Sequence, residues 1–229
     1  MDKKVVLVYS GGSDSFTLLH YLRNLGNTVF PISFDYSQRH ARELLYAKEE
    51  CARLGLPHKV VRIDALRDIA SRSVLTSDAP VPEGFYADEN MKQTVVPNRN
   101  MILLALAAAY AINIGAQALA YGAHAGDHTI YPDCRPAFIE EMARAFALCD
   151  WSPLHLLVPF QDIDKRAIYG WGIAHGLDYS NAWTCYNGRE RACGKCGSCV
   201  ERLHAFHDIG AIDPLRYEDR DYFETVLPK

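Results

Sequence analysis

The sequence has no long apolar run, which excludes a protein built on membrane-spanning helices. Its most apolar stretch, Met101 to Ile114, falls short of the roughly 18 residues that such a helix needs, and Asn113 interrupts it. The beginning, Met1 to Val5, is charged and leads into a strand pattern, so we expect no signal peptide. We therefore expect a cytoplasmic protein whose seven cysteines are free thiols or metal ligands.

The sequence also lacks an excess of basic residues, internal repeats and low-complexity segments. Lys and Arg number 24 against 28 Asp and Glu, which gives a net charge of −4. This balance disfavours a nucleic-acid partner and favours a small-molecule substrate. A chain of 229 residues can bury one large core, arranged in one or two domains.

Two common nucleotide-binding signatures are missing as well. A glycine-containing loop, Ser10 to Ser15, follows the apolar stretch Val5 to Tyr9, but it does not end in the Lys-Ser/Thr pair of a Walker loop. This absence argues against γ-phosphate transfer by a kinase or GTPase. The chain has no Gly-x-Gly-x-x-Gly either, so a dinucleotide-binding site is disfavoured.

The loop itself predicts phosphate binding. Gly11 and Gly12 let the backbone approach a charged ligand, and Asp14 and Ser15 stand where the N-cap and first turn of a helix belong. Free N–H groups and the positive end of the helix dipole would then face phosphate oxygens. A strand, a glycine turn and an amphipathic helix in this order indicate a nucleotide site, although such turns are often merely structural.

The rest of the chain alternates strands and helices. We expect strands at 5–9, 28–34, 58–63, 118–121 and 155–158, with helices between them. This order predicts an α/β fold with a doubly wound, parallel, five-stranded sheet whose ligands lie at the carboxyl ends of the strands. We expect one domain over 1–180 and a C-terminal region over 181–229 packed on the same core. The stretch 71–93 has no clear periodicity and is expected to be a lid.

Four cysteines near the C-terminus have the spacing of metal ligands. Two overlapping Cys-x-x-Cys steps follow a fourth cysteine, so the set is Cys185, Cys193, Cys196 and Cys199. Four thiolates suit a closed tetrahedral zinc site, and an iron–sulfur cluster is the competing interpretation. The Cys-Pro ending of bacterial ferredoxin runs is absent, which favours zinc. Cys51 and Cys149, on helical faces, are expected to be small buried residues.

Six motifs in order resemble the 7-cyano-7-deazaguanine synthase family of the queuosine pathway, a family of pyrophosphate-loop ATPases. They are SGGSDS at Ser10, FDYSQRH at Phe34, VPNRN at Val96, YPDCR at Tyr131, IDK at Ile163 and TCYNG with the cysteines at Thr184. The resemblance implies a fold of the adenine nucleotide alpha hydrolase-like (HUP) type with a C-terminal zinc-binding helical region. It also implies a carbon–nitrogen ligase that forms AMP and pyrophosphate, converting 7-carboxy-7-deazaguanine with ammonia to the amide and then to the nitrile. Structural zinc and a homodimer are implied too.

The same resemblance assigns the ATP site. The loop would bind the phosphates, Asp14 a bridging Mg²⁺, and a strand end the adenine. The ATP-binding residues so implied are Val8, Tyr9, Ser10, Gly11, Gly12, Ser13, Asp14, Ser15, Phe16, Thr17, Leu18, Phe34 and Asp35. Asp14, Lys165 and Arg99 are the implied catalytic residues, with Lys165 stabilising phosphate charge in the transition state.

The implied substrate site follows the fourth expected strand. Its residues are Gly122, His124, Asp127, Tyr131, Asp133 and Arg135, with Asp133 accepting guanine-like N–H groups and Arg135 pairing with the carboxylate. The sequence departs from the family at Thr129 and Ile130, where familiar members have Ser-Gly, so a pocket wall has changed. His124 and His128 with Asp127 could hold a second metal, but hydrogen-bonding histidines are favoured.

Three alternatives stay open. A relative with the altered wall could join the activated carboxylate to another amine, for example a protein N-terminus, or stop at the amide. A pyrophosphate-loop enzyme could instead transfer sulfur to tRNA, although no RNA-binding extension is evident. A non-catalytic zinc module could hold nucleic acid with a set of basic residues, namely Arg189, Arg191, Lys195 and Arg202.

Overall fold

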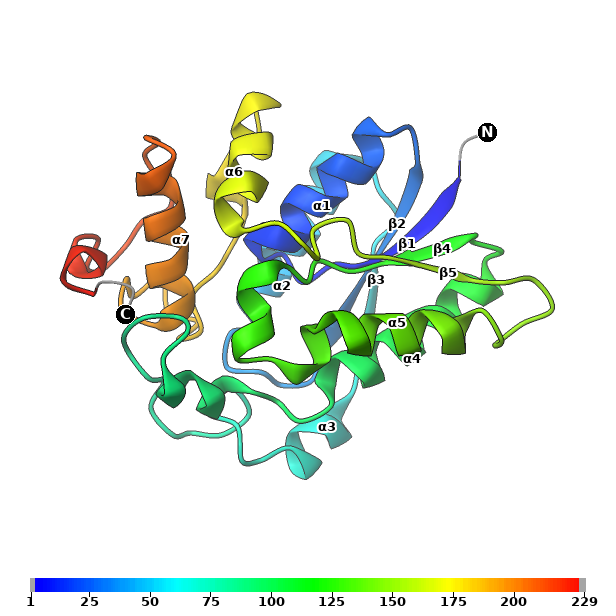
Figure 1. Ribbon diagram of the computed structural model, residues 1–229, viewed down its shortest axis with the longest axis horizontal. Helices are drawn as coiled ribbons and strands as arrows, with labels where there is room; N and C mark the ends of the chain where they lie inside the picture. Colours follow the sequence, from blue (N-terminus) through cyan, green and yellow to red (C-terminus); the bar gives the residue numbers. More distant parts are fainter. Residues whose placement is uncertain (1–2, 227–229) are drawn as a thin grey trace.

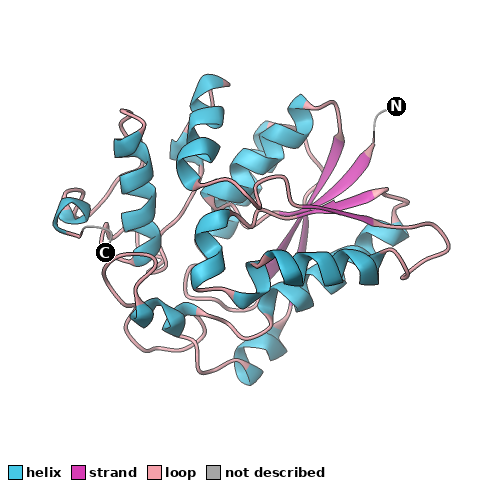
Figure 2. Cartoon of the chain, viewed as in Figure 1, coloured by secondary structure: helices cyan, strands magenta, loops and turns pink. Residues whose placement is uncertain are grey.

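The computed structural model describes residues 3–226, and its centre is a five-stranded parallel sheet (Figures 1 and 2). The strand order is β3-β2-β1-β4-β5, and each pair of neighbours is parallel. The strands are β1 Lys4–Val8, β2 Thr28–Asp35, β3 Lys59–Arg62, β4 Ala118–Ala120 and β5 His155–Leu157. The predicted doubly wound α/β fold is therefore confirmed.

The central strand β1 is buried on both faces, which explains its continuous apolar sequence. Val5 and Leu7 pack with α1 (Ser13–Asn24), α2 (Glu43–Arg53) and α6 (Lys165–Ala174) on one side of the sheet. Val6 packs on the other side with α4 (Arg99–Asn113) and α5 (Pro136–Phe146), below the sheet in Figure 1. The chain leaves β1 toward β2 on one side and returns to β4 on the other, so a crevice opens between the carboxyl ends of β1 and β4.

Several elements differ from the expectation. The helix α1 begins at Ser13 with Gly12 as its N-cap, so Asp14 lies inside the first turn and is not the cap. The irregular stretch after β3 holds the short helix α3 (Asp64–Ile69) and the 3₁₀ helix η1 (Glu89–Thr94). The expected lid is packed against the body of the protein, because Leu75 and Met91 are buried in the core cluster beside the sheet and the N–H of Arg39 donates to the Leu75 carbonyl. Cys149 is exposed, not buried, whereas Cys51 is buried as expected.

Short 3₁₀ turns connect the second half of the chain. They are η2 (Ala125–Thr129) and η3 (Pro132–Cys134) after β4, η4 (Tyr179–Asn181) after α6, and η5 (Tyr222–Thr225). The helix α7 (Gly197–Asp208) starts at the cysteine cluster and packs against α6 (Figure 1). Within residues 3–226, no helix has the length and apolar character to cross a membrane.

A buried arginine ties the C-terminal region to the core. Arg202 of α7 is fully buried, and its Nε and Nη2 atoms donate to the Asp213 carboxylate at 2.8 Å each. Its remaining N–H groups donate to the carbonyls of Tyr179 and Ala182 and to the hydroxyl of Thr184. One guanidinium thus joins three segments. Arg202 therefore offers no cation to a nucleic acid, contrary to the zinc-module interpretation, and a domain boundary near residue 180 stays a prediction.

We expect Arg202→Met to lower the free energy of unfolding by roughly 3–5 kcal/mol, because Asp213 would keep a buried charge without its partner. Adding Asp213→Asn should recover part of this loss, since it removes the orphaned charge. Arg189→Met is the matched control: its ion pair with Glu218 is exposed and should be worth less than about 1 kcal/mol. Urea unfolding of the four proteins measures each value. Equal losses in the Arg202 and Arg189 variants would contradict the argument.

Candidate active site

The phosphate loop lies at the carboxyl end of β1 and depends on glycine. Gly11 has a φ of +88°, and a Cβ there would lie 2.1 Å from the Glu43 carbonyl oxygen, so a side chain is excluded. The Ser10 hydroxyl accepts from the Gly12 N–H at 3.0 Å, which closes the turn. Gly12 caps α1 without a side-chain hydrogen bond, so the first N–H groups of the helix stay available to a ligand.

A cleft opens beside this loop at the switch point between β1 and β4. Gly122, two residues after the end of β4, allows the close approach of this loop to α1: a Cβ there would lie 3.3 Å from the Ser15 nitrogen. The structure brings most of the predicted residues to the lining, namely Val8, Tyr9, Ser10, Gly12, Ser13, Asp14, Ser15, Phe34, Arg99, Gly122, Asp127, Tyr131 and Lys165. Residues from positions 8 to 165 thus surround one space.

Five of the predicted ATP-binding residues do not line the cleft. Phe16, Thr17 and Leu18 are buried in the packing of α1, and the Asp35 carboxylate accepts from the Ser37 N–H. Gly11 contributes only the backbone conformation of the loop, with its positive φ.

Two predicted substrate residues point elsewhere. The Asp133 carboxylate accepts from the Asn100 N–H at 2.9 Å, at the start of α4. Arg135 is exposed and its Nε donates to the His128 carbonyl at 2.9 Å. The geometry brings neither side chain to the cleft, so their roles in substrate binding stay predictions without structural support.

An ion pair stands at the mouth of the phosphate loop. Lys165, the first residue of α6, places its Nζ 3.1 Å from Asp14 Oδ2. Burial opposes the charged form of Lys165, but Asp14 and Glu201 outweigh it and hold the lysine pKa well above its usual range. Burial also disfavours the Asp14 carboxylate, yet Lys165 and His124 keep the pKa of Asp14 below its ordinary value. Both groups are therefore charged at neutral pH.

Asp14 is suited to hold a cation. Its Oδ1 atom is buried and finds no hydrogen-bond partner among residues 3–226. A carboxylate oxygen beside a helix N-terminus and a phosphate loop is a hard ligand of the kind that Mg²⁺ prefers. The donor set thus fits a magnesium ion that would bridge Asp14 and bound phosphates.

Three tyrosines form a wall of the cleft. The Tyr131 hydroxyl lies 3.0 Å from that of Tyr186 and 2.7 Å from that of Thr94, and Tyr86 donates to Asp127 Oδ1 at 2.8 Å. The tyrosines come from segments far apart in sequence. Aromatic faces beside a fixed carboxylate can bind a flat base with N–H donors.

Sequence reasoning missed several residues of the site. Glu43 and His40 lie against the phosphate loop, with their side chains 3.4 Å apart, and burial raises the pKa of Glu43 to about 8. Both belong to a polar stretch that resembles a solvated helix start. Tyr86 lies in the segment expected to be a lid, and Glu201 of α7 reaches Lys165 at 2.8 Å. Only the tertiary fold reveals these neighbours.

His124 belongs to the network behind the cleft. It is buried, and its Nδ1 accepts from the Gly126 N–H at 3.0 Å. In the neutral ring this bond assigns the remaining hydrogen to Nε2. Nε2 then has no lone pair for a metal, which agrees with the favoured hydrogen-bonding interpretation over a second metal site.

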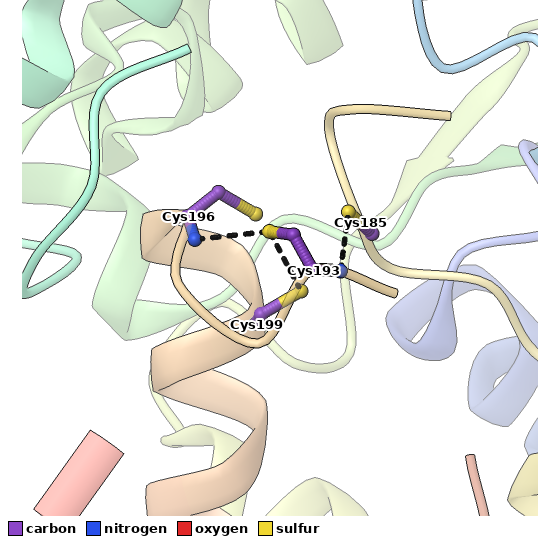
Figure 3. A group of neighbouring side chains, drawn as sticks. All are labelled: Cys185, Cys193, Cys196 and Cys199. Atoms are coloured by element: carbon purple, nitrogen blue, oxygen red, sulfur yellow. Dashed lines mark hydrogen bonds between the residues drawn. The ribbon is translucent and has the colours of Figure 1, made fainter. Parts of the chain in front are cut away.

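The four predicted cysteines converge at the start of α7 (Figure 3). Their sulfur atoms all lie within 4.8 Å of one another and are buried. Cys193 and Cys199 have their sulfurs 4.0 Å apart, close to the roughly 3.8 Å that two ligands of a tetrahedral zinc ion would have at a Zn–S bond of about 2.3 Å. Backbone N–H groups of Asn187, Lys195 and Cys196 point at the sulfurs from 3.3 to 3.4 Å. These donors stabilise thiolates, so the set fits one zinc ion.

The spacing also bears on the iron–sulfur alternative. A four-iron cluster binds each cysteine through a different iron and therefore holds the sulfurs on a wider cage. The close set in this protein favours a single ion. Among the described residues, no other group brings three His, Cys, Asp or Glu ligand atoms as close together.

Comparison with known proteins agrees with this architecture. The family model described as "Queuosine biosynthesis protein QueC" matches residues 4–210. A 7-cyano-7-deazaguanine synthase of Methanoregula boonei is 56% identical over 94% of this chain and 99% of its own length. The synthases of Alteromonas mediterranea and Marinobacter nauticus are 54% and 56% identical, each over 95% of this chain and 99% or more of their own.

Solved structures with a similar fold include the following example. It is a predicted subunit of a tRNA methyltransferase from Methanocaldococcus jannaschii, with a TM-score of 0.51 and 17% identity over 99% of this chain and 93% of that one. At this identity the likeness concerns the fold alone. The family match and the identities over nearly the whole chain carry the assignment: the chain belongs to the 7-cyano-7-deazaguanine synthase family of queuosine biosynthesis.

Proposed function

We propose that this protein is an ATP-dependent ligase that converts 7-carboxy-7-deazaguanine to 7-cyano-7-deazaguanine. The observation that carries the proposal is the Asp14–Lys165 pair at a phosphate loop without a Walker lysine, in a chain of this family. A carboxylate resists attack by ammonia because it is anionic and would have to expel oxide. Attack of a carboxylate oxygen on the α-phosphorus of ATP releases pyrophosphate and creates a good leaving group.

The two halves of the reaction then follow the same chemistry. Ammonia attacks the activated carbon, AMP leaves and a proton is lost, which gives the amide. The amide oxygen attacks the α-phosphorus of a second ATP and releases pyrophosphate, and loss of AMP and of both amide protons then gives the nitrile. The chain must hold two anions and a flat base together, which is largely a matter of positioning and charge.

The residues of the cleft divide this work. The loop and the start of α1 would bind the phosphates, while Lys165 would stabilise the charge that develops as pyrophosphate leaves. Mg²⁺ held by Asp14 would neutralise and orient the phosphates. Arg99 would pair with the substrate carboxylate, and the tyrosine wall with Asp127 would bind the base. The adenine would lie near Phe34, and zinc at the four cysteines would be structural.

The direct test is incubation with ATP, Mg²⁺, 7-carboxy-7-deazaguanine and ammonium, followed by mass analysis of the products. We expect the nitrile and two AMP for each substrate consumed. Amide with one AMP would indicate the shortened reaction, and a conjugate with another amine would indicate a different acceptor. The absence of AMP with every amine would overturn the proposal.

A further inference from the structure

Lys165 is held from two sides by carboxylates with different surroundings. Its Nζ lies 3.1 Å from Asp14 Oδ2 and 2.8 Å from Glu201 Oε2. Asp14 lines the cleft beside the phosphate loop. Glu201 does not line it and comes from α7, the helix that begins at the cysteine cluster. Glu201 therefore holds the lysine from behind, away from the ligand side.

The chain builds a specific space for Glu201. A Cβ on Gly126 would lie only 2.8 Å from Glu201 Oε1, so the glycine leaves room for that oxygen. His124 Nε2, assigned above as an N–H donor, lies 4.0 Å from the same oxygen and 3.5 Å from Asp127 Oδ1. The loop after β4 thus supplies both the room for Glu201 and a ring nitrogen within 4.0 Å of its carboxylate. His124 and Gly126 lie in the same loop as Thr129 and Ile130, where the sequence departs from the family's familiar pattern.

The charge on buried Lys165 explains why a second carboxylate, Glu201, is needed beside it. Lys165 is 6% exposed, and a buried ammonium without a partner is strongly disfavoured. When Asp14 is drawn to a metal ion on bound nucleotide, its hold on Lys165 weakens. Glu201 would then be the lysine's remaining anionic contact and would keep it charged and aimed at the phosphates.

We propose that Glu201 is a positioning residue that anchors Lys165 while Asp14 exchanges its lysine partner for the metal–nucleotide complex. The role rests on the proposed function, because it concerns the same lysine and aspartate. Without the Glu201 charge, Lys165 would pair with Asp14 alone, and the metal would have to break that pair. The lysine would also be misplaced after the metal had bound.

The test measures metal binding apart from turnover. Mn²⁺ is titrated against the protein with the inert analogue α,β-methylene-ATP, and free Mn²⁺ is followed by electron paramagnetic resonance. We expect Glu201→Gln to weaken Mn²⁺ binding about tenfold, whereas Asp208→Asn, an exposed carboxylate on the same helix, leaves it unchanged. In turnover at saturating Mg²⁺, kcat for AMP formation should fall at least tenfold with little change in KM for ATP.

A loss of net charge alone would be overcome by saturating Mg²⁺, so an unchanged kcat there would overturn the inference. Unchanged Mn²⁺ affinity would overturn it as well. Gly126→Ala provides a second variant that leaves α7 intact: its Cβ would lie 2.8 Å from both Glu201 Oε1 and the His124 ring, so it crowds the carboxylate from the loop after β4 and should weaken Mn²⁺ binding in the same direction. If the unaltered protein forms no AMP, the proposed reaction fails, while the Mn²⁺ titration still decides the role of Glu201.

Discussion

Asp14→Asn is expected to reduce AMP formation by about a thousandfold or more while leaving the fold intact. The reason is the loss of a charged oxygen where the metal and the phosphates would meet, since a neutral amide is a poor ligand for Mg²⁺. The side chains of aspartate and asparagine have nearly the same shape, and Glu201 would still pair with Lys165 in the variant. The buried lysine therefore keeps an anionic partner, and stability should change far less than activity.

The measurement is the rate of AMP and pyrophosphate release, with zinc content and the unfolding midpoint recorded for the same samples. Asp68→Asn, on the exposed side of α3, is the matched control and should retain full activity. An Asp14→Asn protein that forms AMP at more than a tenth of the normal rate would show that Asp14 is not the metal ligand. Parallel loss of zinc would instead point to a folding defect.

The fold was accessible from the sequence because its strongest signals are local. The run Val5 to Leu7 is apolar at every position and is followed by a glycine turn, which fits a short strand buried on both faces. The glycines that follow it are required by backbone geometry, as the φ of Gly11 shows. The cysteine cluster was accessible for the same reason, since three of its ligands lie within seven residues of chain.

The site was only partly accessible, because its chemistry joins distant segments. Lys165 and Asp14 are 151 positions apart, and a resemblance, not spacing, connected them. Glu201 follows the cysteine run and looks like a solvated helix residue until α7 packs on α6. Asp133 failed to reach the cleft for an equally non-local reason: the N–H of Asn100 at the start of α4 needs an acceptor, and Asp133 supplies it. Such competition for one carboxylate cannot be read from a linear motif.

Removal of a zinc ion bound at the four cysteines is expected to unfold the C-terminal region and abolish activity. The four sulfurs are buried within 4.8 Å of one another, and Cys196 immediately precedes α7, so a metal bond there fixes the start of that helix. Structural zinc can contribute on the order of 10 kcal/mol to folding. Because α7 also carries Glu201 and Arg202, its loss would release Lys165 and the buried Arg202–Asp213 pair together.

Cys196→Ser should therefore lose stoichiometric zinc and lower the unfolding midpoint by at least about 10 °C, since a loss of about 5 kcal/mol shifts the midpoint of a chain of this size by roughly 10–20 °C. Zinc is measured by mass spectrometry of metals and stability by calorimetry, with and without a chelator. Cys149→Ser, at an exposed cysteine outside the cluster, should change neither value. A Cys196→Ser protein with full zinc and an unchanged midpoint would contradict the structural role. Iron and visible absorbance in the purified protein would show that the cysteines bind an iron–sulfur cluster and not zinc. The short distances between the sulfurs argue against that result.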